Sequence, residues 1–231
     1  MKHVAVYTGT RNVYGDMIVA AKSLIYHKGA EKVVFLTEDD TFPEPLPDIV
    51  QNINVSNQRY FTKDCPNIKR WTYMVLMKVA ACIMTLDASR LLVLDIDTIV
   101  DGDLSGLWSL PDAPIYMAKE IGRSGDYYNA GVMLVNPGLF ADYAKTIIHR
   151  LNIRDYQFCE QDAINEVCQF RINQLPSIYN ASNWTVDPDG KPVITHYAAK
   201  RNWHSEPLWL KYAGMKWDEV MQAYDNPPGQ T

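Results

Sequence analysis

One short segment, an aliphatic run that ends in two aspartates, constrains this chain more than any other. Residues 91–94 read LLVL, and Asp95, Ile96 and Asp97 follow at once. A short apolar run of this kind is typical of a buried strand, and the two-residue period of a strand places Asp95 and Asp97 on the same side. Carboxylates that face one way repel each other unless a cation lies between them, and such oxygen ligands suit Mg²⁺ or Mn²⁺. The alternative is a solvated strand end or turn.

Apolar strand patterns alternate with helical patterns along most of the chain. We predict strands at residues 3–8, 32–36, 49–55, 90–94, 115–118, 131–135 and 192–195. We predict helices at residues 16–27, 70–86, 139–151, 160–170 and 207–224. This alternation favours an α/β fold with a mixed, mostly parallel central sheet flanked by helices. Ligands of such sheets bind at the carboxyl ends of the strands, which directs attention to residues 8–12, residues 95–97 and His196.

Composition excludes several functional classes. The 22 basic and 27 acidic residues give a net charge of 22 − 27 = −5, and no basic stripe is present that would neutralise nucleic-acid phosphates. No stretch approaches the ~20 consecutive apolar residues of a membrane span, and the apolar run at the N-terminus is too short for a signal peptide. We therefore expect a soluble cytoplasmic protein with four reduced cysteines, no membrane insertion and no nucleic-acid partner.

Two further polar segments adjoin predicted elements. Asn129 precedes Ala-Gly and a predicted strand, so its amide lies where glycine permits a close backbone approach; an ordinary turn is the alternative. Glu160, Gln161 and Asp162 lie at a predicted helix start, where the helix dipole favours acidic residues, and capping alone would also explain them.

Three basic side chains and one histidine also stand out. His196 ends the last predicted strand and is either a hydrogen-bonded histidine of the core or a metal ligand. Lys78 lies in an apolar helical stretch, so it either reaches out to water or projects toward an anion. Lys200 and Arg201 follow His196 by four and five positions, and solvated surface charges are the simplest explanation for both.

Six sequence blocks occur together in one order: YTGT at 7–10 with Tyr14, Lys78, LDIDTIV at 94–100, YNAGV at 128–132, QDAIN at 161–165 and ITHY at 194–197. In this order and wording the chain resembles glycosyltransferase family 8, the group that includes glycogenin and bacterial lipopolysaccharide galactosyltransferases and glucosyltransferases. The match runs from about residue 3 to 204. The resemblance implies a GT-A fold, which is Rossmann-like and binds a nucleotide. It also implies a retaining enzyme that moves a hexose, glucose or galactose, from a UDP-sugar with Mn²⁺ (Mg²⁺ is the second choice).

The resemblance also assigns roles by position. Asp95 and Asp97 match the family's DxD motif, and His196 matches its third metal ligand. The positions that match the nucleotide-binding residues of the family are Tyr7, Thr8, Gly9, Thr10, Tyr14, Asp95 and Ile96. The positions that match residues near the transferred sugar are Lys78, Asn129, Glu160, Gln161 and Asp162.

Two departures from the family pattern stand out. The family often reads H-x-x-G-x-x-K-P-W, whereas this chain reads HYAAKRNW at 196–203. Ala199 therefore replaces the glycine, and Lys200 or Arg201 would face the diphosphate. Glu160 stands where the family usually has Asp.

The resemblance implies one catalytic domain over residues 1–231. Residues 1–100 would hold the nucleotide, 101–204 the sugars and the third metal ligand, and 205–231 a C-terminal helix and tail. We expect a nucleotide-sugar and a carbohydrate acceptor as partners, with residues 120–126 on one side of the acceptor groove, and a monomer or weak homodimer. Retention requires either a carboxylate nucleophile, Glu160 or Asp162, or attack from the face that the leaving group departs. The alternatives are a sugar-1-phosphate nucleotidyltransferase and a non-catalytic nucleotide-sugar binding protein.

Overall fold

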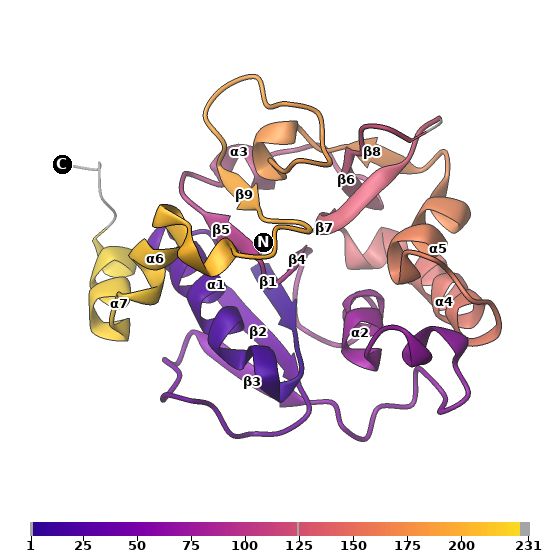
Figure 1. Cartoon of the computed structure of the whole chain (residues 1–231), viewed down its shortest axis with the longest axis horizontal. Coiled ribbons are helices and arrows are strands. Elements are labelled where there is room, and N and C mark those ends of the chain that lie inside the picture. Colours follow the sequence, from indigo (N-terminus) through magenta and orange to yellow (C-terminus); the bar gives the residue numbers. More distant parts are fainter. Residues whose placement is uncertain (1, 124, 227–231) are drawn as a thin grey trace.

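A seven-stranded sheet lies at the centre of the computed structural model, which describes residues 2–123 and 125–226 (Figure 1). Its strand order is β3-β2-β1-β4-β7-β6-β8. The strands are β1 (His3–Thr8), β2 (Lys32–Thr37), β3 (Val50–Asn54), β4 (Arg90–Leu94), β6 (Ile115–Lys119), β7 (Tyr128–Val135) and β8 (Ile172–Gln174). The first four are parallel, and β7 runs antiparallel to both β4 and β6. The expected α/β fold with a mostly parallel sheet is confirmed.

Helices cover both faces of this sheet because each inner strand is apolar on both sides. In β1, Val4 and Val6 face one core, and Ala5 and Tyr7 face the other. The first core lies under α2 (Tyr73–Ala81), α4 (Pro137–Ile153) and α5 (Cys159–Cys168). The second lies under α1 (Tyr14–Tyr26), α3 (Ser105–Trp108) and α7 (Trp217–Asp225), and α6 (Pro207–Ala213) packs beside α1. No helix among the described residues has the length and apolarity needed to cross a membrane.

A two-stranded antiparallel sheet, β5 (Thr98–Val100) with β9 (Ile194–His196), adjoins the main sheet. The sequence pattern predicted neither β5 nor β8, since each has only three residues and no measurable period. In this pairing Thr98 lies opposite His196. The small sheet therefore brings residue 196 to the carboxyl end of β4, a hundred residues away in the sequence.

Three predicted elements differ most from the structure. The helix predicted at 70–86 is only α2, because Asn67 holds the preceding segment: its side chain donates to the carbonyls of Leu151 and Arg154, and its carbonyl accepts from the Trp71 amide. The helix predicted at 207–224 is two helices, since Glu219 caps a new helix at Lys216 after a break at residue 214. The strand predicted at 131–135 begins earlier, at Tyr128. The predicted tail beyond residue 226 lies outside the described residues.

Asp101 ties α6 to the end of β5. Its carboxylate accepts hydrogen bonds from the Lys211 ammonium at 2.9 Å, the Tyr212 hydroxyl at 2.8 Å and the Lys191 ammonium at 3.2 Å. Partial burial alone would raise the pKa of Asp101, but these three donors outweigh it and lower the pKa to about 2.

We expect Asp101→Asn to destabilise the fold at neutral pH by on the order of 1 kcal/mol, after allowance for solvent screening. The depressed pKa contributes stability that is fully present above the ordinary value of 3.8 and is lost as the pH falls toward about 2. Urea unfolding at pH 7, 4 and 3 should therefore show that the difference in free energy of unfolding between wild type and Asp101→Asn becomes smaller as the pH falls. Asp189→Asn, at an exposed loop position, is the control. A difference in free energy of unfolding between wild type and Asp101→Asn that stays constant with pH would contradict the prediction.

Candidate active site

A pocket of about 560 Å³ opens beside the carboxyl end of β4, a volume suited to a small-molecule ligand. Its wall comes from α2, the segment after β4, the end of β6, β7, the start of α5 and residues 198–203. The site residues expected from the sequence that line it are Lys78, Asp95, Ile96, Asp97, Asn129, Glu160 and Gln161. The topology thus gathers polar groups from at least five separate segments.

Asp95 and Asp97 lie in the turn between β4 and β5, because β4 ends at Leu94. Three hydrogen bonds hold this turn. The Asp95 amide donates to the Gly131 carbonyl at 2.8 Å, the Thr98 hydroxyl donates to the Asp95 carbonyl at 2.7 Å, and the Tyr197 amide donates to the Asp97 carbonyl at 2.9 Å. The two carboxylates do converge, but through this turn rather than through the strand period that predicted it.

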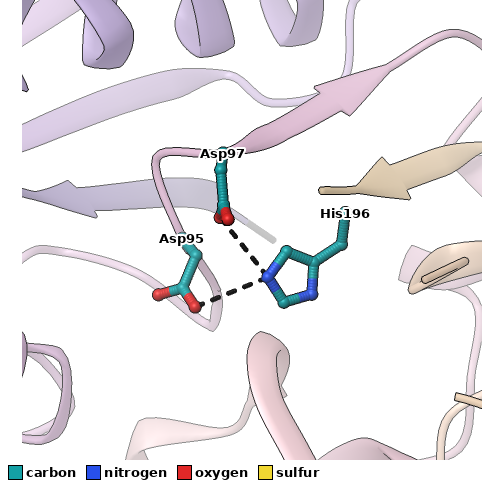
Figure 2. A group of neighbouring side chains, drawn as sticks. All are labelled: Asp95, Asp97 and His196. Carbon is teal, nitrogen blue, oxygen red and sulfur yellow. Dashed lines mark ion pairs between the residues drawn. The ribbon is translucent and has the colours of Figure 1, made fainter. Parts of the chain in front are cut away.

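His196 completes the group (Figure 2). Its Nε2 lies 3.3 Å from Asp97 Oδ1 and 3.7 Å from Asp95 Oδ2. The imidazole lies directly on Gly131, where an added Cβ would come within 2.0 Å of His196 Cε1. Glycine is therefore required at 131 for the ring to occupy this position.

A chain of hydrogen bonds orients the His196 ring. The Gly131 amide donates to Asn129 Oδ1 at 3.0 Å, so the Asn129 side chain presents its oxygen there. Asn180 Nδ2 donates to the same oxygen at 3.0 Å, which leaves Asn180 Oδ1 to accept from His196 Nδ1 at 3.0 Å. The proton on Nδ1 leaves Nε2 directed at the two carboxylates. Hydrogen bonds of this kind orient metal-binding histidines.

The three side chains fit a divalent cation. Asp95, Asp97 and His196 can each offer one ligand atom, and these atoms lie within 4.8 Å of one another. Burial lowers the pKa of His196, but the charge of Asp97, a hydrogen bond to it and the charge of Asp95 outweigh burial and raise that pKa. A cation that replaced a proton on Nε2 would meet two carboxylates and one imidazole, a donor set that suits a divalent metal ion.

Lys78 is buried and contacts two carboxylates. Its Nζ lies 2.6 Å from Asp95 Oδ1 and 2.6 Å from Glu160 Oε1. Burial alone would lower the pKa of Lys78, but the two carboxylates outweigh it and raise the pKa. Of the two predicted alternatives, the lysine projects toward anions rather than toward water. Three carboxylates thus lie near one ammonium, and burial raises the pKa of Glu160 in spite of its contact with Lys78. A divalent cation would balance the excess negative charge.

Gln161, Asn129 and Glu120 form a second polar group. Gln161 Oε1 accepts from the Ala130 amide at 2.9 Å, and its Nε2 donates to the Tyr127 hydroxyl at 3.2 Å. Asn129 Nδ2 donates to the buried Glu120 carboxylate at 3.2 Å. Asn129 is the second residue of β7, beside a register shift in the pairing of β6 with β7, so it lies at the entrance of a strand as predicted and not in the ordinary turn that was the alternative.

Asp162 is occupied by structural contacts. Its carboxylate accepts from the Phe158 amide at 2.8 Å and from the Tyr127 hydroxyl. It therefore stabilises the first turn of α5, as the capping alternative predicted, and it does not line the pocket.

The expected nucleotide-binding residues lie at the carboxyl end of β1, which pairs with β4. Tyr7 is fully buried in the core. A Cβ on Gly9 would come within 2.6 Å of Met17 Sδ, so glycine permits α1 to pack closely there. The Tyr14 hydroxyl accepts from the amides of Glu38 and Asp39. Thr8 and Thr10 are partly exposed at the same edge, and none of these five residues lines the pocket.

The segment after His196 departs from expectation. Lys200 pairs with Glu206 at 2.7 Å, Arg201 is exposed, and neither lines the pocket. Ala199, which replaces the family's glycine, has a φ of +58°. Cys159, beside Glu160, has a φ of +53°. Both line the pocket, and strained backbone of this kind tends to occur at functional sites.

Sequence reasoning missed Asn180 and the role of Glu120. Asn180 is fully buried between Asn129 and His196, but it lies in a stretch without helical or strand period, so no local signal marks it. Glu120 fell inside the predicted acceptor loop of residues 120–126, of which residue 124 is outside the described part of the chain. Its contact with Asn129 depends on the bulge beside it.

Comparison with known proteins identifies the family. The family model described as glycosyl transferase family 8 matches residues 5–206. Glycosyltransferase GlyD of Streptococcus pneumoniae serotype 4 is 23% identical over an alignment of 265 residues. The alignment covers 97% of this chain but only 32% of GlyD.

Solved structures agree on the fold. Glycosyltransferase GlyE of S. pneumoniae superposes with a TM-score of 0.72 at 18% identity, over 97% of this chain and 63% of GlyE. Galactosyltransferase LgtC, solved with donor and acceptor sugar analogs, superposes with a TM-score of 0.67 at 18% identity, over 91% of this chain and 95% of LgtC. Both likenesses support the GT-A fold, and the family match over residues 5–206 decides the family: the chain belongs to glycosyltransferase family 8.

Proposed function

We propose that the chain is a retaining glycosyltransferase that moves a hexose from a UDP-hexose to a carbohydrate acceptor with the help of Mn²⁺. One observation carries this proposal: Asp95, Asp97 and His196 converge within 4.8 Å beside a pocket that also presents Gln161 and Asn129. Because the chain spans about a third of GlyD and under two thirds of GlyE, we draw the activity from its own site rather than from theirs.

The sheet topology supports a nucleotide at this edge. From β1 the chain builds outward through β2 to β3 on one side, and β4 lies on the other. Ligands of open α/β sheets bind where the strand order reverses in this way. We therefore keep Tyr7, Thr8, Gly9, Thr10, Tyr14 and Ile96 as proposed nucleotide contacts, through backbone groups where the side chain is buried. Lys200 or Arg201 would have to move to reach the diphosphate.

The residues present can perform glycosyl transfer. A divalent cation bound by Asp95, Asp97 and His196 would act as a Lewis acid on the diphosphate leaving group. Lys78 holds Asp95 and Glu160 in place through two 2.6 Å contacts and keeps the positive potential near the departing charge. Asn129 and Gln161, with Glu120, present amide and carboxylate groups that can pair with sugar hydroxyls and reject sugars that lack them.

The contacts of the two candidate nucleophiles favour attack from the leaving-group face. Asp162 accepts from Phe158 and Tyr127 and does not line the pocket. Glu160 lines the pocket, but its charge is paired with Lys78. Neither carboxylate is free to form a covalent intermediate, so we favour the route in which Gln161 stabilises an oxocarbenium-like state.

One central sheet supports the proposal of one catalytic domain over residues 1–231, with the nucleotide held by 1–100 and the sugars by 101–204. The cytoplasmic location and the monomeric or weakly dimeric state stay predictions.

We expect the purified protein to release UDP slowly from UDP-glucose or UDP-galactose when Mn²⁺ is present, because water can replace the acceptor. Chelation of the metal should abolish the release, and a suitable saccharide should accelerate it. Binding of UDP-hexose without any release would identify a binding protein. Pyrophosphate-dependent formation of a sugar phosphate would identify a nucleotidyltransferase.

Asp97→Ala should lower metal-dependent UDP release by about 100-fold or more, since one metal ligand is lost. The fold should survive, because Asp97 lies in a turn outside the main sheet. Calorimetric titration with Mn²⁺ checks the binding, thermal unfolding checks the fold, and Asp189→Ala is the matched control. Full activity of Asp97→Ala would remove this metal site from the proposal.

Gly131→Ala should displace the His196 ring, because the new Cβ would overlap it at 2.0 Å. We expect Mn²⁺ affinity to fall by about tenfold or more, in the range of an outer-shell change. Gly15→Ala is the control, since a Cβ there meets no atom within 4 Å. Unchanged Mn²⁺ affinity in Gly131→Ala would show that His196 does not bind the metal in this position.

A further inference from the structure

Two tryptophans in the pocket wall are exposed to solvent. Side chains of this size are usually largely buried. Trp71 is 37% exposed and Trp184 is 47% exposed, and both belong to the pocket wall. Phe158 and Trp203 also line it. Large apolar surfaces held in contact with water mark sites where a ligand binds.

Trp184 is held by the same loop that carries Glu120. The Trp184 carbonyl accepts from the Ile121 amide at 2.8 Å, and Thr185 pairs with Glu120 across an antiparallel bridge. The Thr185 hydroxyl is buried and donates to the Asn180 carbonyl at 2.6 Å. Because Asn180 also contacts His196, these bonds connect the backbone that carries Trp184 to the proposed metal ligands.

Trp71 is held equally firmly. Its amide donates to the Asn67 carbonyl at 2.9 Å, and Asn67 is itself fully buried and bonded to the last turn of α4 and to the segment that follows it. Trp71 lies two residues before α2, the helix that carries Lys78. Both tryptophans are thus partly exposed although hydrogen bonds hold the backbone that carries them.

Charged groups accompany the aromatic surfaces. Arg123 lies over the Phe158 ring at 4.3 Å from its centroid, and its Nε is 3.3 Å from Glu120 Oε2. The pocket that both indoles line also presents the Glu120 carboxylate and the Arg123 guanidinium. This combination matches a pyranose, which has an apolar face of C–H groups and hydroxyls around its edge. A lipid chain would cover the Glu120–Arg123 ion pair and offer neither charge a further hydrogen bond.

We propose that Trp71 and Trp184 form a stacking surface for the acceptor saccharide, whose hydroxyls pair with Glu120 and Arg123. The assignment as acceptor rests on the proposed function, in which the donor occupies the metal end of the pocket. It makes the acceptor a neutral pyranose rather than a peptide or a lipid, and it makes the two tryptophans determinants of acceptor affinity.

Direct saccharide binding tests this assignment. Glucose, galactose, N-acetylglucosamine, lactose and maltose would be titrated separately by calorimetry into protein with UDP and Mn²⁺. Trp184→Leu should weaken the best of these saccharides by about fivefold or more, and Trp184→Phe should retain most of the affinity, since stacking requires an aromatic face. Trp71→Leu should behave as Trp184→Leu does. In each Leu variant the loss should be greater for the saccharide than for UDP.

Phe170→Leu is the matched control, because Phe170 is 88% exposed and does not line the pocket. Equal saccharide affinity in wild type and Trp184→Leu would overturn the assignment, as would binding of none of the five saccharides by wild type. Tryptophan-dependent saccharide binding without turnover of any UDP-hexose would support the stacking surface and contradict the proposed function. Turnover of a UDP-hexose together with unchanged saccharide binding in Trp184→Leu would support the proposed function and contradict the stacking surface.

Discussion

The buried ammonium of Lys78 is the interaction on which the rest of the site depends. It comes from α2, and its two 2.6 Å contacts reach the turn after β4 through Asp95 and the first turn of α5 through Glu160. Loss of one partner from a buried ion pair typically costs about 3–5 kcal/mol, because the remaining charges stay buried and unpaired. Here the loss would bring two carboxylates into direct repulsion. The lysine therefore holds three elements together and sets the charge that a cation would meet.

A second constraint runs through uncharged groups. The amide of Gly131 orients Asn129, Asn129 orients Asn180, and Asn180 orients the His196 ring. The missing side chain at Gly131 also makes room for that ring. One residue thus contributes both a donor and an empty volume, and the empty volume explains why glycine stands at position 131.

The structure shows the surroundings of Glu160 and Ala199, the two residues that depart from the family pattern. Glu160, one methylene longer than Asp, reaches a lysine deep in the pocket wall. Ala199 adopts a positive φ that glycine would adopt at lower cost. Together with Cys159, this places two strained residues in the wall of one pocket, beside the tryptophans that we assign to the acceptor. The positive φ angles of these two residues lower stability at a place where ligands would bind.

By itself, the sequence determined the α/β class, the strand that ends at Leu94, the two aspartates after it and the family, because apolar period and short motifs are local properties of the chain. It also identified Lys78 as unusual, but it could not name the two carboxylates around it. Only the tertiary structure decided that Asp95 and Asp97 converge through a turn, that pairing of β9 with β5 brings His196 to them, that Asp162 caps a helix and that Asn180 orients the imidazole. Most of these depend on contacts between segments far apart in sequence, and such contacts produce no periodic pattern of residues from which they could be predicted.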